Sequence, residues 1–386
     1  MSNTATFRLI PLLIFAVLIF FGAHYFLYYS VVRFFGVASH AIRGTILTVI
    51  FLLPISFFVF SALSHLKQSP LLNFFYIVSA SWLGLAVCFF LAACLVWILA
   101  WLAGLTSLNF NMPVVSAVIF SLSGLLFVYG VWNAFHPQIK NIEVKIKDLP
   151  IAWQDKTIIQ LSDVHLGHIH GVKFLQNIVN KTNAQNPDLV LITGDLFDGM
   201  DGDLSIFIDV LKSLKAKEGV FFVIGNHETF LGVDRAYLVL MEAGIKVLDN
   251  EFIDLNGLQL VGLSYQGEHG MPSVTGKIRD ISEIFTSFKE KGFDLTRPSI
   301  LMHHAPTDIA QAKANGIDLE LSGHTHVGQT IPFGVVTHMI YGKYYYGLTT
   351  EGDFSIYTSS GAGTWGPPMR IGNTPEIVSI KISKSN

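Results

Sequence analysis

The chain has 386 residues, of which 51% are hydrophobic and 14% are charged, and its formal net charge is −3. That total hides a split, because residues 1–135 hold four basic and no acidic residues, whereas the remainder holds all 28 acidic residues and carries a net charge of −7. The first part is too apolar for a soluble domain, and the acidic second part argues against nucleic-acid binding, which needs clustered Lys and Arg.

Four apolar runs predict a transmembrane region over 1–135, with helices at about 9–29, 44–63, 74–101 and 113–133. About 20 apolar residues cross the ~30 Å hydrocarbon core of a bilayer, and each run reaches that length. The third apolar stretch, 71–105, is longer than one span requires, so five spans is the alternative. None of these runs contains Asp, Glu, Lys or Arg. Because ion and proton pathways usually need such groups, the region is expected to be an anchor.

The basic residues near the ends of the runs predict the orientation. With four spans, one side of the membrane receives Arg8, Lys67, Lys140, Lys145 and Lys147, and the other receives Arg33 and Arg43. The positive-inside rule then predicts a multi-pass protein of the cell (inner) membrane with its second domain in the cytoplasm. A fifth span would break this assignment.

From residue 141 to residue 386, short β-branched runs alternate with amphipathic stretches, which predicts an α/β domain with buried sheets. Strands are expected at 141–147, 157–161, 189–193, 220–224, 258–262, 299–303, 319–322, 355–359 and 377–382. Helices are expected at 172–183, 204–216, 234–243, 278–291 and 307–315.

Polar clusters follow five of these strands, at the point where each strand ends. They read Asp163-Val164-His165, Gly194-Asp195, Gly225-Asn226-His227-Glu228, His303-His304 and Gly323-His324-Thr325-His326. Ligands of open α/β sheets bind outside the carboxyl ends of strands, so these side chains are expected to meet at one edge. Imidazole nitrogens together with carboxylate and amide oxygens suit Zn, Fe or Mn. The set is too large for one tetrahedral ion and suits two ions ~3.5–4 Å apart that share a carboxylate.

This order of motifs, D-x-H, GD, GNHE, H and GHTH, resembles that of the calcineurin-like metallophosphoesterase superfamily over Ile142 to Ser383. Bacterial membrane-associated members are similar in their tail, which reads GAGTWGPPMR here at 361–370, although they tend to have Gly where this chain has Val327. The resemblance implies a four-layer αββα sandwich after the transmembrane region.

The resemblance also implies the roles of single residues. The first of two divalent ions (Mn, Zn or Fe) would be held by Asp163, His165, Asp195 and His326, and the second by Asp195 as a bridge with Asn226, His304 and His324. The same resemblance makes His227 the residue that contacts phosphate and protonates the leaving group.

Neighbouring residues have two interpretations each. Arg370 could grip a substrate phosphate or form a structural ion pair, and Asp198 could orient a ligand or occupy a turn. His303 is expected to be a packed neighbour of His304, since adjacent strand residues face opposite ways. The pair His168 and His170 is expected in a solvated loop.

The resulting hypothesis is a membrane-anchored, metal-dependent phosphoesterase acting on a phosphodiester, a pyrophosphate or a phosphomonoester. Its expected partners are the lipid bilayer and a phosphorylated small-molecule or lipid-linked substrate. Ile224 precedes the GNHE motif where Ser/Thr protein phosphatases of the superfamily usually have Arg, which counts against protein substrates. The alternatives are a non-catalytic scaffold of the same fold, or a transporter-like membrane protein with a regulatory phosphoesterase domain.

Overall fold

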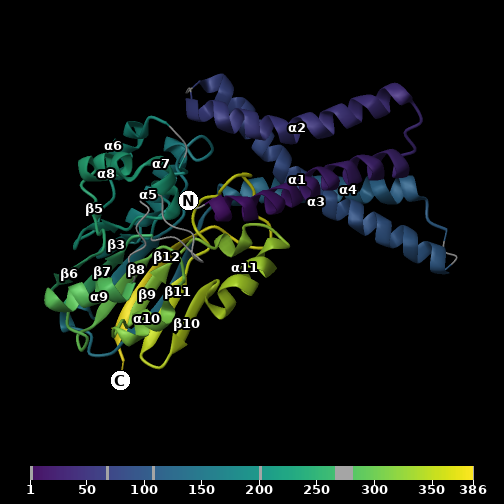
Figure 1. Cartoon of the computed structure of the whole chain (residues 1–386). Coiled ribbons are helices and arrows are strands. Elements are labelled where there is room, and N and C mark those ends of the chain that lie inside the picture. The colour runs from purple at the N-terminus through teal and green to yellow at the C-terminus, as the bar shows by residue number, and fades with distance from the viewer. Residues whose placement is uncertain (1–2, 67–68, 107–108, 200–201, 266–280, 386) are drawn as a thin grey trace. The chain divides into compact units, whose positions relative to one another are not determined.

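The structure is a computed structural model of the whole chain, and it describes every residue except 1–2, 67–68, 107–108, 200–201, 266–280 and 386 (Figure 1). The chain divides into two compact units, Met1–Val131 and Trp132–Asn386. The helix α4 crosses that division, so its last turn belongs to the second unit.

The first unit is built from long apolar helices: α1 (Asn3–Phe34), α2 (His40–Leu66), α3 (Pro70–Thr106) and α4 (Met112–Ala134). All four are long and apolar enough to cross a membrane. The apolar stretch 71–105 lies within one helix, α3, which has 37 residues. Most buried residues of α3 are small, among them Ala80, Gly84 and Ala93. Small side chains let the backbones of neighbouring helices approach closely, which is how helices pack where lipid removes the hydrophobic driving force.

The second unit contains two six-stranded sheets in its described residues. In spatial order, the first sheet has β1 (Gln138–Ile146), β12 (Glu376–Lys384), β2 (Thr157–Leu161), β3 (Leu189–Ile192), β4 (Val220–Phe222) and β5 (Lys246–Val247). The second has β10 (Gly347–Glu351), β11 (Phe354–Thr358), β9 (Leu319–Ser322), β8 (Ser299–His303), β7 (Leu258–Leu263) and β6 (Glu251–Leu255). Strands β2 to β5 are parallel, as are β7, β8, β9 and β11.

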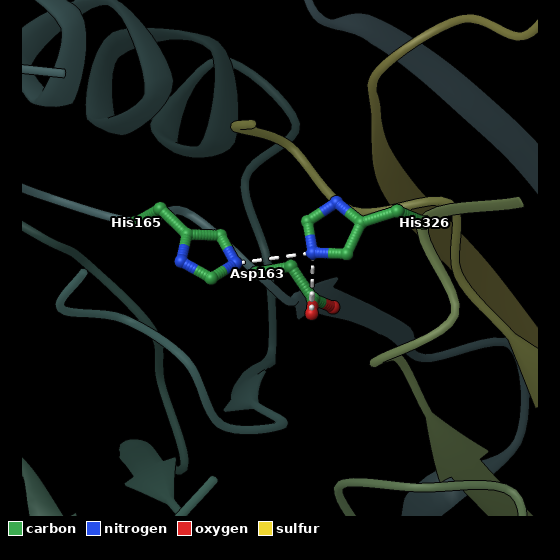
Figure 2. Close-up of side chains that lie close together, drawn as sticks. All are labelled: Asp163, His165 and His326. Atoms are coloured by element: carbon green, nitrogen blue, oxygen red, sulfur yellow. Dashed lines mark hydrogen bonds and ion pairs between the residues drawn. The ribbon is translucent and has the colours of Figure 1, made fainter. Parts of the chain in front are cut away.

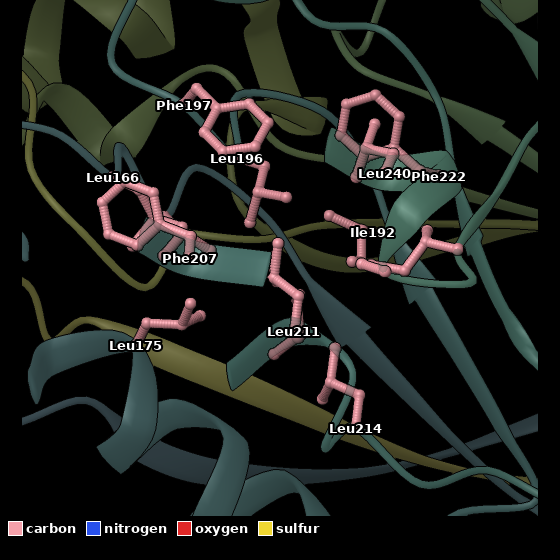
Figure 3. Packing of buried hydrophobic residues seen from close by; sticks show 14 of the residues in the cluster. Leu166, Leu175, Ile192, Leu196, Phe197, Phe207, Leu211, Leu214, Phe222 and Leu240 are labelled. Carbon is pink, nitrogen blue, oxygen red and sulfur yellow. The ribbon is translucent and has the colours of Figure 1, made fainter. Parts of the chain in front are cut away.

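Alternating side chains of the strands build three apolar layers. Ile158 lies in the core between the two sheets, whereas its neighbour Ile159 belongs to the cluster on the outer face, as the two-residue period of a strand requires. The outer cluster packs the first sheet against α5 (Val172–Asn183), α6 (Ile208–Leu211) and α8 (Val233–Glu242), with Leu175, Leu211 and Leu240 among its members (Figure 3).

On the far side of the second sheet, α9 (Ile281–Glu290) and α10 (Ile309–Ala314) cover a third cluster that includes Phe285 and Leu301. The order is therefore helix, sheet, sheet, helix, and the predicted four-layer αββα sandwich is confirmed.

Some elements differ from the sequence prediction. The predicted helix 204–216 is a 3₁₀ turn, Leu204–Phe207, followed by the single turn α6. The pattern did not predict β5, β6 and β10, which are short or half-exposed, nor α7 (Asn226–Leu231) and α11 (Phe333–Tyr341). Helix α11 has no polar stripe to reveal a helical period. The first three residues of the predicted helix 278–291 lie outside the described residues.

Candidate metal centre

The polar clusters meet because their strands end at the same edges of the two sheets. Asp163 and His165 follow β2, Asp195 follows β3, and Asn226 follows β4, all in the parallel part of the first sheet. His304 follows β8, and His324 and His326 follow β9, in the parallel part of the second sheet. The structure thus brings all seven predicted ligands together in two adjacent groups.

The first group consists of Asp163, His165 and His326 (Figure 2). The Nε2 atoms of His165 and His326 lie 3.0 Å apart, and Nε2 of His326 lies 3.3 Å from Oδ1 of Asp163. All three residues are buried. Two ring nitrogens and one carboxylate oxygen therefore converge on one point.

The second group consists of Asp195, Asn226, His304 and His324. Nε2 of His304 lies 3.1 Å from Oδ2 of Asp195. The side-chain oxygen of Asn226 lies 3.0 Å from Nε2 of His304 and 2.9 Å from Nδ1 of His324. Oδ2 of Asp195 also lies 3.9 Å from Nε2 of His165, so this carboxylate stands at the junction of the two groups.

The donor set fits divalent metal ions. The carbonyl oxygen of Thr193 lies 2.8 Å from Nδ1 of His304 and accepts a hydrogen bond from its N–H, so Nε2 of the neutral ring directs its lone pair at the group. Imidazole, carboxylate and amide donors together match Zn, Fe or Mn, and buried donors at contact distance are costly unless a cation or proton joins them.

The ionisation of the carboxyl groups supports this fit. Burial raises the pKa of Asp163. The attraction of His326 and the hydrogen bond between the two residues lower this pKa by more, so the net pKa is below the usual value. For Asp195 burial acts the same way, and His304 and His227 bring the net pKa well below the usual value. Burial lowers the pKa of His304, but Asp195 raises it to about 10. A cation must therefore displace a proton from His304, and metal binding is expected to release protons.

Two glycines allow the close approach of the loops. A Cβ atom on Gly225 would collide with the carboxylate of Asp195, and one on Gly323 would collide with Ser162 and Asp163. The glycines of the GNHE and GHTH motifs are thus explained by the backbone lying directly against a ligand residue.

Arg370 lies behind the first group and does not reach solvent. It is fully buried, and its Nη2 lies 3.1 Å from Nδ1 of His326 and donates to the carbonyl oxygens of Ser360 and Gly363 at 2.6 and 2.7 Å. Its Nη1 donates to Oδ1 of Asn373 at 2.8 Å. The prediction that Arg370 binds substrate is therefore wrong, because its donors are used by the protein behind His326.

Glu228 lies behind the second group and was assigned no role from the sequence. Its Oε2 accepts from the backbone N–H groups of Asp195 and Gly225 at 3.0 and 2.9 Å, and its Oε1 accepts from that of Phe197 at 3.0 Å. Burial, followed by the charge of Asp195, raises its pKa to about 7. The signal was present, because an acidic residue three positions after a helix N-cap is the capping-box pattern, and Gly225 is the N-cap of α7.

His227 lies beside both groups. Its Nδ1–H donates to the carbonyl oxygen of Asp198 at 2.8 Å, and its ring centroid is 4.6 Å from that of His165. Burial lowers its pKa, but Asp195 and Asp198 raise it more, so the net pKa is above the usual value. The rings of Phe230 and Trp365 lie 5.6 and 6.1 Å from His227 and are 64% and 61% exposed. Exposed aromatic side chains therefore lie beside His227.

The remaining candidates occupy supporting positions. Oδ1 of Asp198 lies 3.3 Å from Nδ1 of His165, next to that ring. His303 is buried, with its Nδ1 3.7 Å from Oε1 of Glu320.

The expected solvated loop is only half correct, because His168 is partly exposed but His170 is fully buried. The Nε2 of His170 accepts from the backbone N–H of Thr364 at 3.0 Å, and burial lowers its pKa to about 3. His170 thus ties the first loop to the tail 361–370.

Comparison with known proteins agrees with this site. A family described as calcineurin-like phosphoesterase matches residues 156–328. A protein of Helicobacter pylori described as an uncharacterized metallophosphoesterase is 34% identical over 263 residues, which cover 66% of this chain and 68% of the relative. A protein of Campylobacter jejuni with the same description is 32% identical over 267 residues, covering 68% of this chain and 67% of the relative.

A zebrafish (Danio rerio) protein described as a transmembrane protein with metallophosphoesterase domain is 31% identical over 297 residues, covering 72% of this chain and 64% of the relative. The chain belongs to the calcineurin-like metallophosphoesterase family. It is a metal-binding phosphoester hydrolase by class, with four helices able to cross a membrane.

Proposed function

We propose that this chain is a membrane-anchored phosphoesterase that uses two divalent ions to hydrolyse a phosphodiester or pyrophosphate of a lipid-linked or cell-envelope substrate. The observation that supports this proposal most strongly is the pair of buried donor groups that share Asp195 and have His227 beside them.

In this proposal Asp163, His165 and His326 would hold one ion, Asn226, His304 and His324 would hold the other, and Asp195 would serve both. Bound there, the two ions would lower the pKa of a water molecule and neutralise charge on the phosphate oxygens. The chain's own task is to keep both groups dry and at fixed spacing, which the buried ligands and their backing hydrogen bonds favour.

His227 is the proposed general acid. The hydrogen bond from its Nδ1–H to the carbonyl of Asp198 fixes the ring and leaves Nε2 to carry the proton that the leaving oxygen takes.

The substrate and topology parts of the proposal depend on the membrane helices and on charge. The four spans keep the catalytic unit at a bilayer, where lipid-linked phosphates are concentrated. The basic residues flanking the spans favour the inner membrane with the catalytic unit in the cytoplasm. Ile224 is buried at the GNHE loop, so no cation occupies the position at which protein phosphatases usually have Arg.

The test is hydrolysis of bis-p-nitrophenyl phosphate and p-nitrophenyl phosphate by the purified full chain with Mn, Zn, Fe, Mg or no metal. We expect metal-dependent turnover with preference for the diester. Asp195→Asn should abolish turnover and reduce metal content at both positions, whereas the matched control Asp209→Asn, an exposed residue of α6, should keep both. Absence of turnover with two ions bound would favour the scaffold alternative, and full turnover of Asp195→Asn would refute the bridging role.

A further inference from the structure

The helix α11 exposes apolar side chains along its whole length, and none of its residues is buried. The exposed side chains, here called the α11 surface, are 46–79% exposed and comprise Ile331, Phe333, Val335, Val336, Met339 and Ile340. Scattered apolar residues are normal on a protein surface, but a contiguous group of this kind marks a site of contact with a protein or a membrane.

The composition around α11 favours lipid as the contact. Between Glu320 and Glu351 the sequence contains one charged residue, Lys343, which forms an ion pair with Glu351. The helix is followed by three consecutive tyrosines, 344–346. Interfaces between proteins have polar, charged rims, whereas the headgroup region of a bilayer accepts apolar side chains flanked by aromatic ones.

Hydrogen bonds connect α11 to the end of a membrane span. Asn133, in the last turn of α4, donates to the carbonyl oxygens of Arg370 and Asn373 at 3.1 and 2.8 Å. The neighbouring Ile371 pairs with the segment that leads into α11, because its carbonyl accepts from the N–H of Ile331 at 3.0 Å. All these residues belong to the second unit. The start of α11 is therefore connected to the last turn of α4 through the segment 370–373, by one set of hydrogen bonds on each side of that segment.

The end of α11 lies beside the metal centre. The ring of Tyr341, the last residue of α11, lies 6.2 Å from that of His324. Trp365 is exposed, and its ring lies 6.1 Å from that of His227. Gln329 holds it in place, because Oε1 of Gln329 accepts from the backbone N–H of Trp365 at 2.9 Å. Two aromatic side chains, Tyr341 at the end of α11 and the exposed Trp365, therefore lie next to the metal centre.

We propose that the α11 surface, with Trp365, inserts into the headgroup region of the bilayer that the four spans cross, and that the metal centre opens at that interface. The substrate is then a phosphoester in the headgroup of a membrane lipid, which is cleaved without leaving the bilayer. The docking stands on the α11 surface alone, whereas this substrate class rests on the proposed function.

The docking is tested by a fluorophore on a single cysteine, Met339→Cys, in the full chain with Cys88 and Cys94 replaced by alanine. The matched control is Met241→Cys on α8, a methionine that is 73% exposed compared with 79% for Met339. The labelled protein is placed, one copy per disc, in nanodiscs of phosphatidylethanolamine and phosphatidylglycerol with or without a spin-labelled phosphatidylcholine. Because interfacial helices lie ~5–10 Å into the headgroup boundary, we expect the spin label to lower fluorescence about twofold or more at 339 and to leave 241 unchanged.

Equal fluorescence with and without the spin label at position 339 would overturn the proposal. If position 339 is also shielded from a water-soluble quencher in that case, a protein surface covers α11. Shielding that depends on protein concentration in detergent would identify a second copy as that surface, and shielding that does not would identify the chain's own spans.

The substrate class is tested with two diesters that share one leaving group. Hexadecyl p-nitrophenyl phosphate is presented in the nanodisc bilayer, and bis-p-nitrophenyl phosphate is presented in solution. Val335→Asp with Met339→Asp should lower turnover of the bilayer diester about tenfold, because charged side chains are disfavoured in apolar membrane regions. Turnover of the soluble diester should stay within about twofold, and the control pair Leu238→Asp with Met241→Asp should change neither.

Equal losses on both diesters would contradict the lipid substrate. Failure of the unaltered chain on both diesters would count against the proposed function, and with it the substrate class, while the spin-label result would still decide the docking.

Discussion

The two halves of the candidate metal centre use the same kinds of donor but are backed by buried side chains of opposite charge. Behind the first half, the guanidinium of Arg370 contacts His326 and the carbonyls of the tail 361–370. Behind the second half, the carboxylate of Glu228 collects backbone N–H groups of the loops that carry Asp195 and Asn226. A buried charge is costly unless its hydrogen bonds are complete. Each buried charge therefore positions the backbone of the loops around it. Arg370 holds carbonyl groups in the first half, and Glu228 holds N–H groups in the second.

The largest expected effect belongs to a residue that serves neither half as a ligand. His227→Ala should lower turnover of bis-p-nitrophenyl phosphate ~10²–10⁴-fold, the range of a lost general acid, while both ions stay bound. The measurement pairs steady-state kinetics with metal content by elemental analysis. Loss of an ion from the variant would make His227 a ligand, because its ring also lies in a group with His165 and Asp195.

Arg370→Lys should lower the metal affinity of the first half and leave that of the second half unchanged. Lysine carries its donors on one nitrogen and lacks the planar fork of a guanidinium, so it cannot reproduce the contacts with His326, Ser360 and Gly363, and the first half should lose affinity for its ion ~10–100-fold, as other losses behind a metal ligand do. The second half should be unchanged. Titration of the metal-free protein with Mn or Zn resolves the two steps, and Arg235→Lys on α8 is the control. A uniform loss at both positions would contradict the separation of roles.

Glu228→Gln should act on the opposite half and on stability. The amide keeps one acceptor oxygen and places an NH₂ group against backbone donors, so we expect a loss of ~1–3 kcal/mol in the free energy of unfolding. Thermal unfolding of the full chain measures it. The exposed Glu242→Gln should leave the transition unchanged, since its ion pair with Lys212 is on the surface. An unchanged transition for Glu228→Gln would show that the backbone donors find other acceptors.

The smallest expected effect is on stability and concerns a residue of the first half alone. Val327, directly after His326, has a left-handed backbone with φ 53° and ψ 32°, a conformation that β-branched residues rarely adopt. Val327→Gly should raise the free energy of unfolding by ~0.5–1 kcal/mol, the left-handed penalty less the flexibility that glycine adds to the unfolded chain. Val210→Gly in α6, which is helical, should lower it. Destabilisation by Val327→Gly would mean that the packing of the valine side chain exceeds the strain.

Much of the fold followed from local patterns. The strands at 157–161, 299–303 and 319–322 and the helix at 172–183 have the predicted bounds, because each is bounded by polar or turn residues and keeps its period throughout. The strand β5 was missed, since its two residues carry too little pattern and gain their structure from the neighbouring strand β4.

The seven proposed ligand residues could be named from the sequence, because polar clusters follow strands whose carboxyl ends meet at one edge and the resemblance to the metallophosphoesterase family singles out the ligand positions within each cluster. His303 was also anticipated as a packed neighbour of a ligand, whereas for Asp198 a turn position was the equal alternative. The misjudged residues, Arg370 and His170, are polar side chains whose surroundings come from segments far apart in the chain: Arg370 meets His326, and His170 meets Thr364.

The sequence by itself determined the apolar spans, the αββα sandwich and the residue types of the metal centre, because hydropathy, strand period and ligand chemistry are properties of short segments. Only the tertiary structure decided which charges are buried behind the ligands and which apolar side chains stay exposed. Hydropathy records that the residues of α11 avoid water, but whether they meet protein or lipid depends on what the rest of the fold leaves uncovered.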